Sequence, residues 1–247
     1  MKRIHLLVML LLWFGFLQIQ AYNIRHISSG DGLSSSSVLT IEQQPNGTML
    51  FGTVDGLNSY DGHKVWLTAF NVGQRLYGNL IEHVLTVEEN KTWVLTNYGL
   101  NIVTEKGQTV RYYPQFQGIR RIRRNPQNDG FLLTDDKLNF IDKRDGSVHS
   151  LPLKGVKIAN ICDFAVTRQE LLIFGRDGIH AYPLRMEKGL YVIGQPTIIK
   201  HIQLITAVPD GETVYLVDAQ GLLYSYDLSK KTMRYELSLA TEIGRRG

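Results

Sequence analysis

The residue types that most often perform catalysis are scattered through this sequence. No nucleophile elbow, phosphate-binding loop, zinc-binding His-Glu-x-x-His motif or calcium-binding loop occurs. An isolated histidine on a strand is more often a packing or surface residue than a metal ligand, and the seven histidines stand singly, at positions 5, 26, 63, 83, 149, 180 and 201. Asp135-Asp136 could serve acid–base chemistry or hold a cation, but a turn that favours aspartate explains the pair better. We therefore expect no catalytic residue, no metal site and no cofactor.

A second group of polar and aromatic residues suits ligand binding, because its members occupy one place in a repeated segment. The segment 51–61 recurs, in the same arrangement, at 94–104, 132–142, 173–183 and 216–226. Each copy has an apolar run, a polar pair, glycine in most copies, and a second run in which apolar and polar residues alternate. The first four polar pairs supply the candidate residues Asp55, Asn97, Tyr98, Asp136, Arg176 and Asp177.

The elements that must position these residues are β-hairpins. Two short runs joined by a polar, glycine-containing turn are typical of antiparallel strands. A further strand precedes each hairpin and another follows it, and four strands recurring about every 40 residues indicate propeller blades. We predict an all-β fold, a β-propeller with five four-stranded blades and no helix after residue 21. The predicted blades are residues 38–70, 81–113, 119–151, 161–193 and 202–237.

Three local features depart from the regular repeat. Lys137 occupies the turn position that glycine fills in the other copies, so we expect a different or strained turn there. The fourth repeat carries a longer insertion from Pro183 to Gly189. Asn23–Ile27 precedes the first repeat and resembles a fourth strand, which would complete the last blade of a closed ring.

Composition excludes several classes of protein. The chain is 43% hydrophobic and 20% charged, which is typical of a globular protein and excludes disorder. Its net charge of +4 is too small to indicate nucleic-acid binding. The densest basic run, Arg120 to Arg124, lacks stacking aromatic residues, and we interpret it as a solvated strand edge or the root of a ligand-facing loop. The single cysteine, Cys162, permits no disulfide within the chain.

Residues 1–21 are typical of a secretory signal peptide. Lys2 and Arg3 precede an apolar run over 6–17, and Ala21 offers a small residue for cleavage. Ile19 is larger than the residue preferred there, so an uncleaved anchor is the alternative. We expect residues 22–247 to form an exported, periplasmic partial propeller. Because the sequence stops after the fifth repeat, we expect it to be the N-terminal part of a longer protein.

The first repeat resembles a known family. Gly32–Ile41 and Gly47–Gly62 are similar to the two-component regulator propeller repeat, and the match is looser in the later copies. The resemblance implies a seven-bladed ring in the exported sensor half of a bacterial hybrid two-component system, followed by a histidine kinase in downstream sequence. It also implies an oligosaccharide ligand. The expected partners are this ligand, further blades of the same protein and a second copy of the chain, with contact to a membrane only through the longer protein or an uncleaved signal.

In a propeller, the turns between second and third strands share a face with the connectors between blades. The connectors contribute four more candidates, Arg75, Tyr77, Tyr113 and Gln115. Aromatic rings can cover the apolar side of a sugar while Arg, Asp and Asn bond its hydroxyls. Turns also collect Asp, Asn and Arg for structural reasons, so Tyr77, Tyr98, Tyr113 and Arg176 are the strongest candidates. A lyase or hydrolase on the same scaffold and a protein-interaction propeller remain as alternatives.

Overall fold

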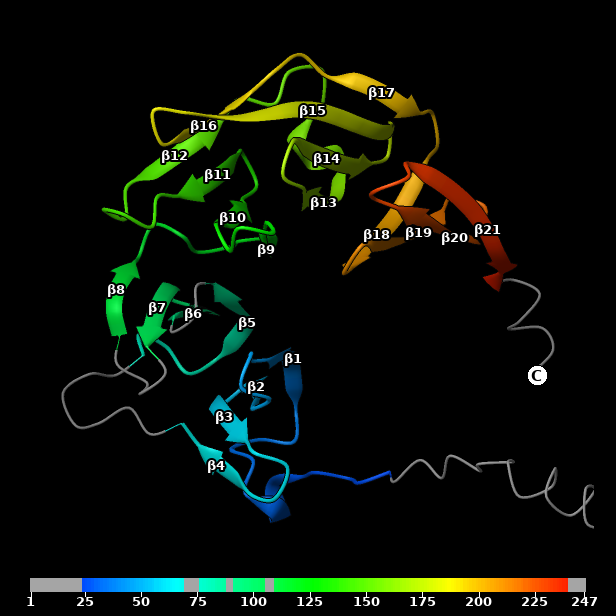
Figure 1. Cartoon of the computed structure of the whole chain (residues 1–247). Helices are drawn as coiled ribbons and strands as arrows, with labels where there is room; N and C mark the ends of the chain where they lie inside the picture. The colour runs from blue at the N-terminus through cyan, green and yellow to red at the C-terminus, as the bar shows by residue number, and fades with distance from the viewer. Residues whose placement is uncertain (1–23, 69–75, 88–90, 105–108, 240–247) are drawn as a thin grey trace, which may run out of the picture.

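Each copy of the repeated segment forms the two middle strands of a four-stranded sheet in the computed structural model. The structure describes residues 24–68, 76–87, 91–104 and 109–239. The predicted signal peptide lies outside these residues. Five antiparallel sheets follow one another in chain order around an arc (Figure 1). The predicted β-propeller is therefore confirmed.

Within each blade the strands run from the inside of the arc to the outside in chain order. The first blade contains β1 (Val38–Gln43), β2 (Met49–Thr53), β3 (Gly56–Tyr60) and β4 (Val65–Leu67). The second contains β5 (Ile81–Val87), β6 (Lys91–Thr96), β7 (Gly99–Thr104) and β8 (Thr109–Tyr113). The third contains β9 (Arg121–Arg124), β10 (Gly130–Leu133), β11 (Leu138–Ile141) and β12 (Val148–Leu151). The fifth contains β18 (Leu204–Asp210), β19 (Thr213–Asp218), β20 (Leu222–Asp227) and β21 (Thr232–Ser238).

The fourth blade has five strands. They are β13 (Ile161–Val166), β14 (Glu170–Gly175), β15 (Gly178–Glu187), β16 (Leu190–Ile193) and β17 (Thr197–Lys200). The predicted insertion from Pro183 to Gly189 takes the form of a longer hairpin, because β15 continues to Glu187 and pairs there with β16. The first half of β15 pairs with β17, so two short strands share the outermost place of this blade. A long hairpin thus extends beyond the regular blade.

One further expectation about the chain differs from the structure, and a second, that Asn23–Ile27 completes the last blade of a closed ring, stays a prediction because the described strands form an open arc. We predicted no helix after residue 21, but the chain forms two single 3-10 turns, at Ser29–Asp31 and Ile158–Asn160. Residues 24–27 form no strand, and Arg25 instead donates from Nη1 to the Tyr60 hydroxyl at 3.2 Å. An isolated segment needs an unpaired sheet edge to become a strand, and this segment pairs with none in the described part of the chain.

The turn between second and third strands takes two forms. Gly56, Gly99 and Gly178 have φ angles of 128°, 132° and 136°, which L side chains rarely adopt. Lys137 fills the same position without a positive φ. Its carbonyl oxygen accepts hydrogen bonds from the backbone nitrogen of Thr134 at 2.9 Å and from Oγ1 of Thr134 at 3.1 Å. The turn of the third blade is therefore different from the others and free of backbone strain.

The core is divided among the boundaries between successive blades, and a cluster of buried apolar side chains fills each of the four. Strand β6 shows the arrangement. Trp93 and Leu95 pack toward the third blade, while Val94 packs toward the first. Alternate side chains of a strand point to opposite faces of its sheet. Because a neighbouring blade covers each face here, both sets of side chains are apolar, and the sequences of the middle strands are continuous apolar runs. Each such side chain stabilises its boundary by roughly 1.5–3 kcal/mol.

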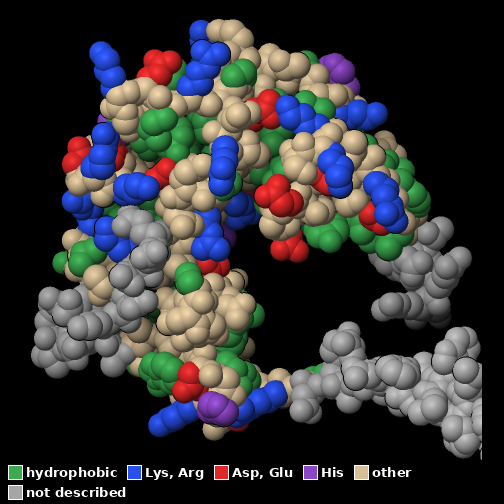
Figure 2. All heavy atoms as spheres, in the orientation of Figure 1, with side chains coloured by type: hydrophobic (Ala, Val, Ile, Leu, Met, Phe, Trp, Pro, Cys, Tyr) green, Lys and Arg blue, Asp and Glu red, His purple; other side chains and the backbone are tan. Residues whose placement is uncertain are grey.

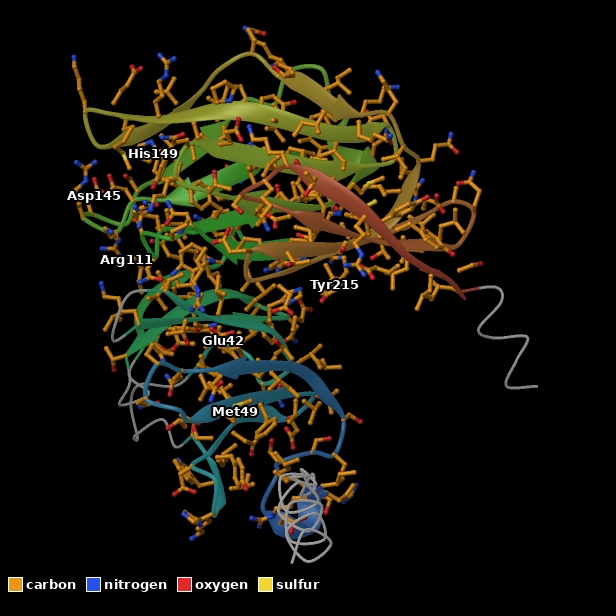
Figure 3. The ribbon with its side chains drawn as sticks, turned by 45° about the vertical axis from the view of Figure 1, so that its right-hand side comes forward. Glu42, Met49, Arg111, Asp145, His149 and Tyr215 are labelled. Atoms are coloured by element: carbon orange, nitrogen blue, oxygen red, sulfur yellow. The ribbon has the colours of Figure 1, made fainter. Side chains whose placement is uncertain are left out.

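The first and fifth blades lie at the two ends of the arc and each leaves one sheet face uncovered by another described blade (Figure 1). Figure 3 marks Met49 and Tyr215 on these two blades. The exposed apolar side chains of the two end faces include Leu39, Ile41, Ile205, Val208 and Tyr215. In β19, the flanking Val214 and Leu216 are buried against the fourth blade. The end faces therefore have the apolar character of the boundaries inside the arc.

Candidate functional site

Hydrogen bonds place the predicted ligand-binding turns and the connectors between blades on one face. Nδ2 of Asn79, in the connector after the first blade, donates to Oδ1 of Asp55 at 2.9 Å. The backbone nitrogen of Arg176 donates to the carbonyl oxygen of Asn160 at 2.9 Å, again joining a turn to a connector. We call this surface, made of the second-to-third-strand turns and the blade connectors, the connector face.

An aromatic group lies on the connector face of the second blade. The rings of Tyr77 and Tyr112 stack with centroids 4.0 Å apart, and the hydroxyl of Tyr112 donates to the carbonyl oxygen of Tyr98 at 2.5 Å. Tyr77 and Tyr98 are 54% and 56% exposed, and Asn97 beside them is also exposed. Tyr112 was not among the predicted residues, although its place next to Tyr113 at the end of an outer strand could have indicated it. Exposed tyrosine rings held in this way can stack on a sugar.

The remaining predicted residues of the connector face differ in their exposure to solvent. Tyr113 is buried between the second and third blades, where its hydroxyl donates to a backbone carbonyl of the third blade at 2.8 Å. Asp136 is exposed, and its carboxylate lies 3.3 Å from the amine of Lys137. Gln115 is exposed in the connector after the second blade. Arg75 lies outside the described residues.

An open cavity of about 800 Å³ lies on the connector face between the fourth and fifth blades. Its lining includes the predicted residues Arg176 and Asp177. The other lining residues are Lys200, His201, Ile202, Gln203, Asp218, Gln220, Tyr224 and Met233. The structure thus gathers some of the predicted residues into two groups, an aromatic one on the second blade and a charged one between the fourth and fifth, and leaves Asp55, Asp136 and Gln115 outside both.

Asp218 organises the wall of this cavity that comes from the fifth blade. Its carboxylate accepts hydrogen bonds from the backbone nitrogens of Gln220 and Leu222 at 3.0 and 2.9 Å and from the Tyr224 hydroxyl at 3.1 Å. Burial, together with the bond to Asp218, raises the pKa of Tyr224. Asp218 and Gln220 were missed, although Gln220 occupies the turn position of Asp177 in the fifth copy of the repeat and Asp218 ends the strand just before that turn.

The basic run on β9 lies on the innermost strand of its blade and links three blades. Arg121 and Arg123 both bond to Asp163 of β13, with Nε of Arg121 3.1 Å from Oδ2. Nη1 of Arg124 lies 3.2 Å from Oε1 of Glu42 on β1, which Figure 3 marks. Asp163 is 1% exposed, and its burial raises its pKa against the opposing effect of the two guanidinium groups. The basic run Arg120–Arg124 therefore joins neighbouring blades, and our interpretation of it as a solvated strand edge or the root of a ligand-facing loop is wrong.

Two other kinds of site are absent from the part of the chain that the structure describes. No group of three or more His, Cys, Asp or Glu side chains there could hold a metal ion. No helix there is both long and apolar enough to cross a membrane.

Comparison with known proteins shows similarity in fold. No protein-family model matches the sequence, and neither does any curated protein. The extracellular domain of a hybrid two-component system of B. thetaiotaomicron has a TM-score of 0.62 at 18% identity, and the match covers 87% of this chain and 32% of that chain. PorZ, a surface component of the type-IX secretion system of Porphyromonas gingivalis, has a TM-score of 0.61 at 11% identity, with 83% of this chain and 28% of that chain covered. Virginiamycin B lyase from Staphylococcus aureus has a TM-score of 0.55 at 10% identity, covering 81% of this chain and 69% of that chain.

These similarities establish the propeller fold. The chain spans 32% and 28% of the first two proteins. The extracellular domain of a two-component system, a secretion component and a lyase share this fold, so the fold alone does not fix the function.

Proposed function

We propose that this chain is the ligand-sensing propeller of a longer two-component sensor. In this proposal it is exported to the periplasm, recognises an oligosaccharide and controls a histidine kinase elsewhere in the same protein. The chain itself catalyses no reaction and binds no nucleic acid. The observation that carries the proposal is the open cavity between the fourth and fifth blades on the connector face.

The chemistry of the cavity suits a sugar. Two cations (Arg176 and Lys200), the carboxylate of Asp177 and the amide of Gln203 supply both donors and acceptors for hydroxyl groups. The ring of Tyr224 adds an apolar surface of the kind that covers a sugar ring. Polar groups converging in an open cleft beside an aromatic ring are typical of small-molecule recognition. The tyrosines of the second blade extend the same chemistry along the connector face.

Calorimetric titration of the purified chain with a panel of neutral and acidic oligosaccharides tests the proposal. We expect one class of sugar to bind, and Arg176→Ala to weaken it by about tenfold, the loss expected for one charge-assisted hydrogen bond. Arg234→Ala is the matched control, because Arg234 is exposed on β21 and does not line the cavity. A sugar that binds with unchanged affinity to the Tyr77→Ala, Tyr98→Ala and Arg176→Ala variants would show that the connector face is not the binding surface.

The same cavity gives one reason to keep an enzyme as the second candidate. His201, Tyr224 and Arg176 line it together, and these residue types can remove a proton and stabilise charge in an elimination. The raised pKa of Tyr224 opposes this function, because it disfavours the tyrosinate that would act as a base. Time-dependent formation of an unsaturated product, followed by ultraviolet absorbance and lost in His201→Ala, would favour the lyase.

A further inference from the structure

The face opposite the connector face contains two cavities on either side of the third blade. One, of about 250 Å³, lies between the second and third blades, and the other, of about 470 Å³, lies between the third and fourth. Both are lined by Asp129, Asp142, Lys143 and Arg144. We propose that the larger cavity binds a sugar acid, through a carboxylate held by its cations and a ring that packs on its apolar wall.

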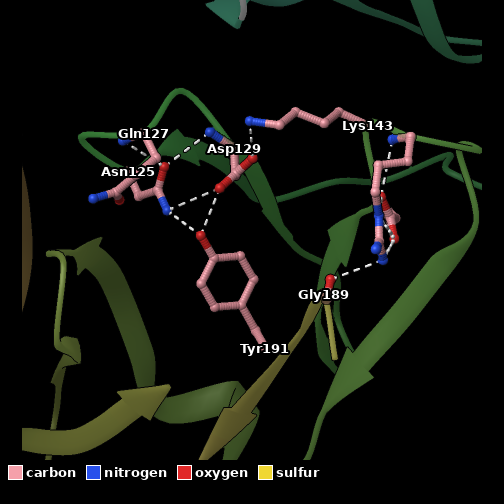
Figure 4. A network of polar contacts seen from close by, with 8 residues as sticks. Asn125, Gln127, Asp129, Lys143, Gly189 and Tyr191 are labelled. Atoms are coloured by element: carbon pink, nitrogen blue, oxygen red, sulfur yellow. Dashed lines mark hydrogen bonds and ion pairs between the residues drawn. The ribbon is translucent and has the colours of Figure 1, made fainter. Parts of the chain in front are cut away.

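One wall of the larger cavity is built by the long hairpin of the fourth blade. Met186, Gly189 and Tyr191 come from the hairpin of β15 and β16, which extends beyond the regular blade. The hydroxyl of Tyr191 donates to Oδ2 of Asp129 at 2.6 Å and accepts from Nδ2 of Asn125 at 2.5 Å (Figure 4). The extra hairpin is thereby fixed to the turn between β9 and β10 of the third blade.

The position of Arg144 in this cavity is fixed by the turn after β11 and by the long hairpin. In the turn after β11, the backbone nitrogen of Arg144 donates to Oδ1 of Asp142 at 2.9 Å, and its side chain forms an ion pair with the same carboxylate. Nη2 of Arg144 also donates to the carbonyl oxygen of Gly189 at 3.0 Å (Figure 4). A Cβ at Gly189 would lie 2.0 Å from Nη1 of Arg144. Glycine therefore leaves the space that the guanidinium group occupies.

The charges that face the larger cavity favour an anion. Asp129 and Asp142 are mostly buried and already neutralised by Lys143 and Arg144, respectively. The hydrogen bonds and charge of Arg144 hold the pKa of Asp142 at about 2. Arg168, in the turn between β13 and β14, is exposed and forms no ion pair with the described residues. The cations are therefore in excess over the carboxylates at the cavity mouth.

Apolar side chains supply the other half of the recognition. The half-buried ring of Tyr191 lies edge to face on the buried Phe140, with ring centroids 5.2 Å apart and an interplanar angle of 89°, so Tyr191 presents the surface that a sugar ring can reach. Met186 is exposed at the end of β15, and Gln127 adds an amide that can bond a hydroxyl. An apolar wall beside clustered cations fits a hexuronate, in which a carboxylate is attached to a ring that has an apolar side.

Titration of the purified full chain with a galacturonate trisaccharide tests this site, and its methyl-esterified form serves as the uncharged ligand. We expect saturable binding of the acid, at least about tenfold weaker binding of the ester, and a loss of about tenfold in Arg168→Ala. Arg168→Lys should recover part of that loss because it keeps the charge. Arg168 has no ion-pair partner to lose among the described residues, so these variants should fold normally.

An exposed arginine elsewhere provides the control. Arg234→Ala should bind the galacturonate trisaccharide as the unmodified chain does, since Arg234 does not line this cavity. No binding of the acid, equal binding of acid and ester, or an equal loss in Arg234→Ala would overturn the assignment. A loss in Arg176→Ala alone would also overturn it and would instead support binding at the connector face, so the failures of the two proposals can be told apart.

Discussion

Arg121 on β9 and Asp163 on β13 meet across the boundary between the third and fourth blades, with Nε 3.1 Å from Oδ2. Arg123 reaches the same carboxylate oxygen from two residues further along the strand. One buried carboxylate thus holds two arginines of the neighbouring blade near the inside of the arc. Electrostatic pairing therefore supplements apolar packing at this boundary.

Asp163→Asn should destabilise the protein by about 2–3 kcal/mol. The loss from breaking a buried ion pair is about 3–5 kcal/mol, and partial exposure of the two arginines reduces it because water can solvate them. The free energy of unfolding in urea measures the effect, with Asp210→Asn as the control because Asp210 is exposed at the end of β18. Equal stability of the two variants would mean that the pairing contributes nothing.

The architecture was predictable from the sequence because every blade repeats a local pattern. The hairpin at 94–104, for example, has its strands and its turn encoded within eleven consecutive residues. The end of β15 was not predictable in this way. Its last four residues, Leu184 to Glu187, are of types that favour helix, and they form a strand because β16 supplies a partner.

The candidate site was harder to predict because its members meet only through contacts between blades. Tyr98 and Tyr113 look equivalent in the sequence, but one is 56% exposed and the other is buried against the third blade. The arginines of β9 lack any local sign of their partner Asp163, which lies about forty residues away. The spacing of the repeats thus predicted which residues lie on the connector face, whereas the solvent exposure of each side chain depends on contacts with the neighbouring blade.

Gly130→Ala should destabilise the boundary between the second and third blades. A Cβ there would lie 2.2 Å from Cη2 of Trp93, which is buried and packed on its other sides. Overpacking of this kind costs about 1–3 kcal/mol. Thermal or urea unfolding checks the prediction against Gly30→Ala, where the nearest atom would be 3.5 Å away. Similar midpoints for the two variants would mean that Trp93 can move aside.

His83 on β5 should make the protein less stable as the pH falls below neutrality. Burial, and then the charges of Arg121 and Arg123, lower its pKa from the usual 6.5. Above pH 6.5 the imidazole is neutral in both states and has no effect. As the pH falls from 6.5 toward the lowered pKa, the unfolded chain binds the proton first, so the free energy of unfolding decreases.

Urea unfolding at pH 8, 6 and 5 tests this linkage. The decrease between pH 8 and 5 should be smaller in His83→Gln than in the unmodified chain, because glutamine does not titrate. His26→Gln is the control, since His26 is exposed near the start of the described chain. An identical pH dependence in the His83→Gln variant and the unmodified chain would show that this histidine does not carry the effect.

The two end faces should make the isolated chain associate. Ile205 and Val208 of β18 are 60% and 54% exposed, and they occupy the face opposite the one that packs on the fourth blade. Uncapped repeat arrays expose such faces, and exposed apolar patches promote association. We expect sedimentation velocity to show larger species as the protein concentration rises, and the double variant Ile205→Glu/Val208→Glu to shift the distribution toward monomer through charge repulsion. Val192→Glu, on exposed β16 away from both ends, should leave the distribution unchanged. A monomer at all concentrations with a cooperative thermal transition would contradict this prediction and would mean that the end faces need no cover.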